Sequence, residues 1–454
     1  MRIRHLLPAA LLLAGTAACN DLLQTEPVVA LPQDQMISDA ATAQAALNGA
    51  YASLQSTASY GRGLLTLGDV AADNAVWTGT FQFVADIANN RIVADNSEIT
   101  GIWNSAYQQI DRDNVIIQRV AAVPGIPDAV RNDVLGQAHF LRALSYHNLV
   151  KYWGAVPMPL EPASSPAVAE GYTRTPVAEV YAQILRDLDR AQSLIQNTAN
   201  TRQATPTAVR ALRARVLLYR ASLPNSANAA ADLQGALDAA GQVLGASNAL
   251  TTPYADLFSP AGSNTAEDVF RVIFLANQAN SLGFWYLRAG RAELSPSPSL
   301  DAAYAPGDLR RAVTIRATGN AGRPLDGAKW GTAAGTEHVH VIRRAELVLI
   351  RAEVLARQGN LAGAVEAYNA VRARAGLAPH VLGRDVTTAA DVLAAIDRER
   401  RLELALEGDR FPDLVRRGVA AQVKGFTDRA YQALMPIPLR ELQTTRGLQQ
   451  NPGY

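Results

Sequence analysis

Apolar residues recur every three or four positions through the first half of the chain, the spacing that places side chains on one face of a helix. Capping residues stand before several of these segments, and in two cases a threonine is followed by proline, which is tolerated in a first helical turn. The predicted helices begin at Ser38 or Asp39, at Thr100, at about Asp128 (ending at Trp153), after Thr175-Pro176, after Thr205-Pro206 and near Ala227. This half is therefore predicted to be helical.

Helical spacing returns in the last quarter of the chain. The segment Arg351–Gly376 predicts two helices separated at Gly359-Asn360, a pattern typical of the tetratricopeptide hairpin, a repeat of about 34 residues. A last long helix is predicted over about Thr388–Glu407. We expect a mainly α fold: a tetratricopeptide-like helical-hairpin scaffold over about 34–260 and 340–454, with a few short strands.

The segment between these helical regions has a different pattern. Residues Val269–Leu275 alternate in a way that predicts a strand, but Asn277 to about Gly335 shows no sustained periodicity. Long irregular segments within folded chains are commonly functional or disordered, and the aromatic content of this one argues against disorder. We therefore expect a large, loop-rich insertion over about 261–339 that faces a ligand.

The N-terminus predicts export. Arg2 and Arg4 precede an apolar run and a tract of small residues, so residues 1–18 are predicted to be a signal peptide. Cys19, the only cysteine, follows directly, as in a bacterial lipobox, although Thr16 stands where leucine is usual. We expect lipidation at Cys19 and a lipidated tether over 19–33; an ordinary signal peptide with an incidental cysteine is the alternative. Multiple acyl chains hold a protein stably at a membrane.

Charge and motifs exclude several classes of function. The net charge of +1 favours no nucleic acid, and the sequence contains no P-loop, no Gly-x-Gly-x-x-Gly after a strand and no Gly-x-Ser-x-Gly. His338 and His340 would share one face of a strand, but further zinc ligands are not evident. No metal or cofactor is predicted.

Two carboxylates stand on apolar helical stripes. Glu353 and Glu399 are predicted to be partly buried, and a buried carboxylate must be paired or its pKa rises. Arginines such as Arg410 and Arg416 are candidate partners. We interpret these charges as structural ion pairs, not as catalytic groups.

Aromatic residues in the irregular segments are the best candidates for ligand binding. Aromatic faces can stack on the apolar faces of sugar rings, while amide and guanidinium groups bind hydroxyls. The alternative is that these side chains pack the loops onto the core. The predicted ligand-binding residues are Asn74, Trp77, Trp285, Tyr286, Arg288 and Trp330.

Several stretches together resemble one family, the SusD/RagB nutrient-uptake lipoproteins. They span essentially the whole chain after the signal peptide, and their order and spacing are specific. The stretches are CNDLL (Cys19–Leu23), LGDVAADNAVW (Leu67–Trp77), WNSAYQQIDRDNVII (Trp103–Ile117), GQAHFLRALSYHNLVKYWGAVPMPL (Gly136–Leu160), RRAELVLIRAEVLARQGN (Arg343–Asn360), ERRLELALEGDRFPDLVRRG (Glu399–Gly418) and the terminal MPIPLRELQ and QNPGY.

This resemblance implies a lipid-anchored protein exposed on the outer membrane that captures a nutrient, typically a glycan, without cleaving it. It implies a partner, a SusC-like TonB-dependent outer-membrane transporter, to which the nutrient is delivered. Two other hypotheses remain at this point. One is a tetratricopeptide-like scaffold that binds only proteins, and the other is a helical surface enzyme such as a glycosidase.

Overall fold

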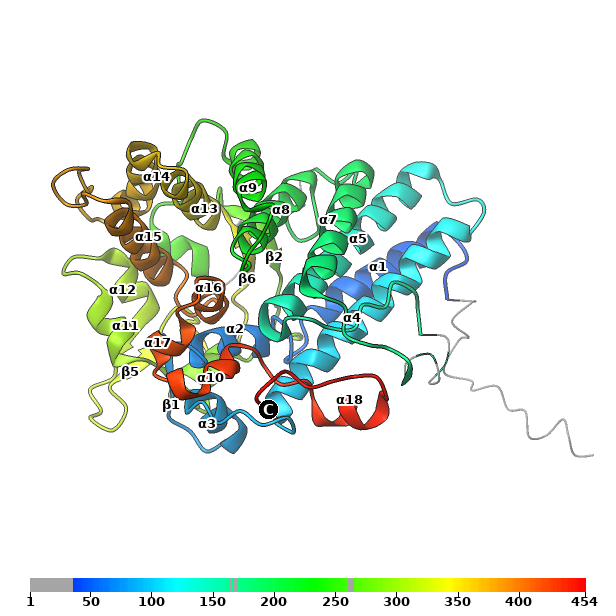
Figure 1. Ribbon diagram of the computed structural model, residues 1–454, viewed down its shortest axis with the longest axis horizontal. Helices are drawn as coiled ribbons and strands as arrows, with labels where there is room; N and C mark the ends of the chain where they lie inside the picture. Colours follow the sequence, from blue (N-terminus) through cyan, green and yellow to red (C-terminus); the bar gives the residue numbers. More distant parts are fainter. Residues whose placement is uncertain (1–35, 164, 166–167, 169, 199, 260–264) are drawn as a thin grey trace, which may run out of the picture.

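Long helices form the scaffold of the protein, and they gather at two ends of it (Figure 1). The computed structural model describes residues 36–163, 165, 168, 170–198, 200–259 and 265–454. The predicted signal peptide, Cys19 and the tether lie outside these residues. More than half of the chain is helical with few short strands, so the predicted mainly α, tetratricopeptide-like fold is confirmed. No helix in the described ranges has the length and apolar character needed to cross a membrane.

The first half supplies most of the long helices. They are α1 (Ala40–Ser53), α2 (Gly63–Val70), α3 (Gln82–Ala88), α4 (Ser97–Ala122), α5 (Asp128–Trp153), α7 (Val177–Leu194), α8 (Pro206–Ala221) and α9 (Ala229–Leu244). Helix α5 packs between α4 and α7, and α8 packs against α9. Helix α5 buries apolar side chains such as Phe140, Leu141 and Leu144 and also polar ones such as Arg142 and Asn148.

The second half adds a hairpin and many short elements. They are η1 (Tyr254–Phe258), α10 (Leu282–Tyr286), α11 (Pro298–Ala303), α12 (Leu309–Thr314), α13 (Arg344–Arg357), α14 (Leu361–Arg374), α15 (Ala389–Glu403), α16 (Arg410–Arg416), α17 (Ala420–Lys424), η2 (Thr427–Ala433) and α18 (Leu439–Thr444). Helices α13 and α14 form the predicted hairpin, which turns at Gly359 with a φ of 85°. Helix α13 also packs on α9, so the hairpin continues the first half of the scaffold.

The described residues form three two-stranded antiparallel sheets, and two of these connect distant parts of the chain. They pair β1 (Ala75–Trp77) with β3 (Leu294–Pro296), β2 (Asp268–Val272) with β6 (Val339–Arg343), and β4 (Ile315–Ala317) with β5 (Leu325–Gly327). The predicted strand is β2, which is shorter than the alternating segment. The pairing of β2 with β6 joins the two ends of the insertion, and the pairing of β1 with β3 fastens its middle to the first half.

Helix boundaries follow the capping residues in most places. Asp39 caps α1 in a capping box with Thr42, and the Thr205 side chain accepts from the Ala208 N–H at the start of α8. The predicted Thr175 cap is wrong: Pro176 is the N-cap of α7, and no side chain caps this helix. The predicted start at Thr100 is three residues late, because Asn96 caps α4 and the helix begins at Ser97.

The C-terminal long helix ends earlier than predicted. Helix α15 stops at Glu403 instead of Glu407, and Leu406 and Gly408 then adopt positive φ values of 63° and 80°. This turn lies against α2: a Cβ on Gly68 would stand 2.0 Å from the Gly408 carbonyl oxygen. The close backbone approach therefore requires glycine at position 68.

The carboxylates predicted to be paired are paired. Arg416 binds Glu353 with two hydrogen bonds of 2.7 and 2.6 Å, and Glu399 lies 2.9 Å from Arg310 and 2.7 Å from Arg372. Arg410, a suggested partner, binds Asp73 and Asp397 instead.

The two histidines of the 337–340 segment make protein contacts. The Phe274 N–H donates to Nδ1 of His338, and Nε2 of His340 contacts the Leu257 carbonyl oxygen. Within the described residues, no group of three or more His, Cys, Asp or Glu side chains is placed to hold a metal ion.

Candidate functional site

The predicted ligand residues come from two segments that β1 and β3 bring together. Trp77 of β1 stands opposite Leu294 of β3, so the loop before α3 lies beside the middle of the insertion. Elements β1, α3, α10 and β5 gather along one edge of the molecule (Figure 1). The site is therefore built from sequence positions more than 200 residues apart.

A buried carboxylate positions the loop that leads into β1. Asp69 at the end of α2 accepts from the Asn74 side chain at 3.1 Å and from the backbone N–H groups of Leu406 and Gly408 at 3.2 and 3.0 Å. Burial raises the pKa of Asp69 to about 7, although these hydrogen bonds act in the opposite direction. Asp69 thus joins the end of α2 to the turn after α15.

Two arginines hold the same loop from the other side. The Asp73 carboxylate lies 2.8 Å from Arg410 and 3.0 Å from Arg401, and Arg401 also donates to the Asn74 side-chain oxygen at 3.0 Å. Burial acts to raise the pKa of Asp73, but the hydrogen bond and charge of Arg410, together with Arg401, lower it below its usual value. The loop before Trp77 is consequently fixed by charged groups of the C-terminal helices.

Glu293 holds the loop after Trp77. Its carboxylate accepts from the backbone N–H groups of Thr80 and Phe81 at 2.8 and 3.2 Å and from Arg291 at 2.7 Å. A Cβ on Gly79 would lie 1.7 Å from this carboxylate, so only glycine permits the approach. The contacts of Glu293 therefore hold the loop that carries the aromatic residues of 77–83 against the insertion.

Where the loop after Trp77 meets the insertion, aromatic rings stack on one another and two guanidinium groups pack on them. The Phe81 ring stacks on Trp285 with centroids 5.6 Å apart and an interplanar angle of 21°, and Phe83 stacks on Phe81 at 5.1 Å. The guanidinium of Arg291 lies 4.0 Å from the Phe81 centroid, and that of Arg62 lies 3.9 Å from the Trp285 centroid. Such cation–π contacts favour a flat, ordered aromatic stack.

The six predicted ligand residues fall into different environments. Trp77 is half-buried, and Trp285 is 7% exposed within the stack. Arg288 is exposed and donates to the Thr318 carbonyl at 3.0 Å.

The remaining three predicted residues are buried. Asn74 is bound by Asp69 and Arg401, Tyr286 has no exposed surface, and Trp330 donates from Nε1 to the Leu406 carbonyl at 3.1 Å. In this conformation Asn74, Tyr286 and Trp330 pack beneath the surface of the site and help to hold its loops in place.

Sequence reasoning did not select four residues that the structure places here. Phe81 and Phe83 complete the stack, Phe284 is 43% exposed beside Trp285 in the chain, and Arg62 comes from the start of α2. The sequence signals were the aromatic pair shortly after Trp77 and the position of Phe284 directly before Trp285, whereas Arg62 carries none. The arrangement offers half-buried aromatic rings with arginine side chains beside them, which suits stacking and hydrogen bonding to a polar ligand.

Comparisons with known proteins agree with this architecture. A family model described as starch-binding associating with outer membrane matches residues 23–218, and a model of the SusD family matches residues 322–429. SusD-like protein P2 from Formosa agariphila is 27% identical, with 98% of each chain covered. SusD-like protein P38 from the same organism is 24% identical, with 96% of each chain covered.

Solved structures have the same fold. A SusD superfamily protein from Bacteroides vulgatus superposes with a TM-score of 0.81 at 20% identity, covering 92% of this chain and 99% of the other. A laminarin-binding SusD-like protein superposes with a TM-score of 0.78 at 24% identity, covering 92% and 100%. The two family models together span more than half of the sequence, and the chain belongs to the SusD/RagB family.

Proposed function

We propose that this protein is a non-catalytic carbohydrate-binding protein that captures an oligosaccharide at the aromatic stack. The observation that carries the proposal is the Phe81–Trp285 stack, which Arg62 and Arg291 flank. Family membership supports it, as do the laminarin-binding and surface glycan-binding proteins among the structures with the same fold.

Accessible groups beside the stack make the ligand contacts in this proposal. Trp77 and Phe83 are half-buried and Phe284 is exposed, so their rings can cover the apolar face of a sugar. Arg288 and Arg291 are partly exposed and supply hydrogen-bond donors for hydroxyl oxygens. The buried Asn74, Tyr286 and Trp330 act by holding the loops in place.

In the same proposal the protein works at the outer membrane. Lipidation at Cys19 anchors it there, and a SusC-like TonB-dependent transporter receives the captured nutrient. Co-purification with the barrel protein encoded beside its gene would test the partnership. A barrel that does not co-purify from detergent-solubilised membranes would contradict it.

Affinity electrophoresis against a panel of polysaccharides, including laminarin and starch, tests the ligand class. Trp77→Ala and Phe284→Ala should each weaken binding by about 10- to 150-fold, because covering an aromatic side chain contributes on the order of 1.5–3 kcal/mol. Leu439→Ala is the matched control, since Leu439 is an exposed apolar residue on α18, away from the stack.

Three outcomes separate the alternatives. Unchanged binding in both aromatic variants would place the ligand site elsewhere. No binding to any polysaccharide would favour the protein-binding scaffold. Release of reducing ends from a bound polysaccharide would contradict the non-catalytic assignment.

A further inference from the structure

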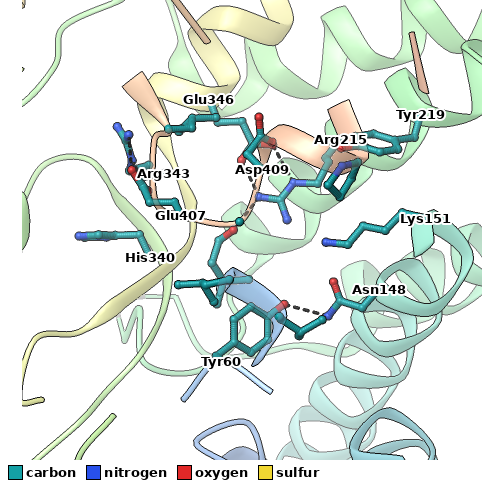
Figure 2. A pocket seen from close by; sticks show the side chains of 16 residues that line it. Tyr60, Asn148, Lys151, Arg215, Tyr219, His340, Arg343, Glu346, Glu407 and Asp409 are labelled. Carbon is teal, nitrogen blue, oxygen red and sulfur yellow. Dashed lines mark hydrogen bonds and ion pairs between the residues drawn. The ribbon is translucent and has the colours of Figure 1, made fainter. Parts of the chain in front are cut away.

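A small polar cavity lies beside Lys151 of α5, and no residue of the aromatic stack lines it (Figure 2). Helices α5 and α8, strand β6 and the turn after α15 surround it, and its volume is about 60 Å³. One water requires roughly 10–15 Å³ in this measure, so the cavity holds a few non-hydrogen atoms but not a sugar ring.

Lys151 points into this cavity without a protein acceptor. The chain has three lysines, and all three lie in the described residues. Lys329 lies 2.8 Å from Glu407, and Lys424 donates to the carbonyl oxygens of Val70 and Ala72. Among the described residues, Nζ of Lys151 has no hydrogen-bond or ion-pair partner, and Figure 2 shows it directed toward the space between Asn148 and Arg215.

The carboxylates around the cavity are already bound by other cations. Arg215 binds Glu346 through Nε at 2.7 Å and Nη2 at 2.5 Å, and Arg400 binds Asp409 with two hydrogen bonds of 2.8 and 2.5 Å. Glu407 is held by Arg343 and Lys329. None of these carboxylates lies within ion-pairing distance of Lys151 in the part of the chain that the structure describes.

Two neighbouring side chains have further unused hydrogen-bonding capacity. Nη1 of Arg215 has no acceptor among the described residues, because its bonds to Glu346 and Val341 use Nε and Nη2. Asn148 is 6% exposed and donates from Nδ2 to the Tyr60 hydroxyl at 2.9 Å, which orients this amide at the cavity. The cavity thus contains two cationic groups with free donors, and a ligand that carries acceptors and negative charge satisfies both.

We infer that this cavity is a binding site for a small oxyanion, a carboxylate of about the size of formate, held between Lys151 and Arg215. The bound anion links α5 to α8 and lies next to the turn that follows α15. Burial, followed by the neighbouring charge of Arg215, lowers the pKa of Lys151 to about 7, and a bound anion raises it again. This site is independent of glycan binding and does not rest on the proposed function.

Lysine labelled with ¹³C at the ε position provides a direct test, because the protein gives only three lysine signals. The mature protein is titrated with formate at fixed pH, with ionic strength balanced by an organic anion too large for the cavity. We expect a saturable shift of the Lys151 signal, assigned by its loss in Lys151→Met, and no shift of the Lys329 and Lys424 signals. Inorganic phosphate and chloride serve as separate arms, and tighter binding of either would overturn the carboxylate assignment.

Stability provides a second readout that does not depend on labelling. Formate should raise the melting temperature of the wild type and of Lys424→Met, but not that of Lys151→Met. Asn148→Asp retains the lysine and supplies a competing carboxylate, so formate should bind at least about tenfold more weakly. Parallel, non-saturating shifts of all three lysine signals, or equal stabilisation of the wild type and Lys151→Met, would show a general salt effect and refute the site.

Discussion

The helical bundle around α5 and the insertion between β2 and β6 are held by different interactions. Helix α5 buries Phe140, Leu141 and Leu144 against its neighbours, and a buried ion pair between Arg142 and Asp187 adds to this apolar packing. The insertion is instead joined to the C-terminal helices by buried charges, among them Arg310 with Glu399 and Lys329 with Glu407.

This difference matters because apolar packing and buried ion pairs differ in how well they tolerate amino-acid substitutions. Apolar packing is non-directional and tolerates many partners of about the right size. A buried charge requires a specific opposite charge at hydrogen-bonding distance. The bundle should therefore tolerate conservative core changes, whereas the insertion should depend on single charged residues.

Breaking the ionic network should have the largest effect. Glu403 has no exposed surface and is bound by Arg343, Arg374 and, from the insertion, Arg310, so Glu403→Gln removes the buried negative charge that these three arginines share. We expect a loss of about 3–5 kcal/mol in the free energy of unfolding, measured by urea denaturation. The control is Glu366→Gln, because Glu366 is exposed on α14. A loss below about 1 kcal/mol would contradict the role given to the network.

An apolar deletion in the bundle should have a comparable or smaller effect. Leu144→Ala removes buried methyl groups from α5 and should lower the free energy of unfolding by about 2–5 kcal/mol. Leu144→Met, which keeps the volume, should cost less than about 1.5 kcal/mol. If Leu144→Met is as destabilising as Leu144→Ala, the bundle depends on the exact shape of its core side chains. That result would contradict the expected tolerance of the bundle to conservative changes.

Acid should weaken the insertion through Glu407. Although burial acts to raise it, the charges of Arg343 and Lys329 lower the pKa of Glu407 from 4.5 to about 2. A carboxylate with a lowered folded-state pKa contributes stability that is present above pH 4.5 and lost as the pH falls toward 2, here on the order of 3 kcal/mol. Urea denaturation at several pH values should show this slope in the wild type and a shallower slope in Glu407→Gln. Equal slopes would show that other carboxylates dominate.

Two threonines before prolines provide the smallest and most selective test. Thr205 caps α8, whereas the Thr175 side chain caps no helix. Thr205→Ala should lower the free energy of unfolding by about 1 kcal/mol, and Thr175→Ala should change it by less than about 0.5 kcal/mol. Thermal unfolding of the two variants can be compared directly. Equal losses would mean that the sequence pattern, and not the observed cap, determines the contribution.

The candidate site was only partly predictable. Trp77 and Trp285 stand out in the sequence as aromatic residues in irregular segments, and the structure places Trp285 in the stack and Trp77 on β1, opposite Leu294. Arg62 carries no such signal, because its position over Trp285 depends on how α2 meets the insertion. Trp330 has the sequence signal without the accessibility: it is an aromatic residue in an irregular segment, but its side chain is completely buried.

The helical scaffold follows from local patterns in the amino-acid sequence. Helical spacing and local caps are properties of neighbouring residues, so the bounds of α5, the cap at Thr205 and the hairpin of α13 and α14 follow from them. Tertiary contacts set where α15 ends, which arginine pairs with which carboxylate, and which aromatic rings remain accessible. These depend on contacts between residues far apart in the chain, such as Asp69 with Leu406 and Phe81 with Trp285, and local sequence patterns carry no information about them.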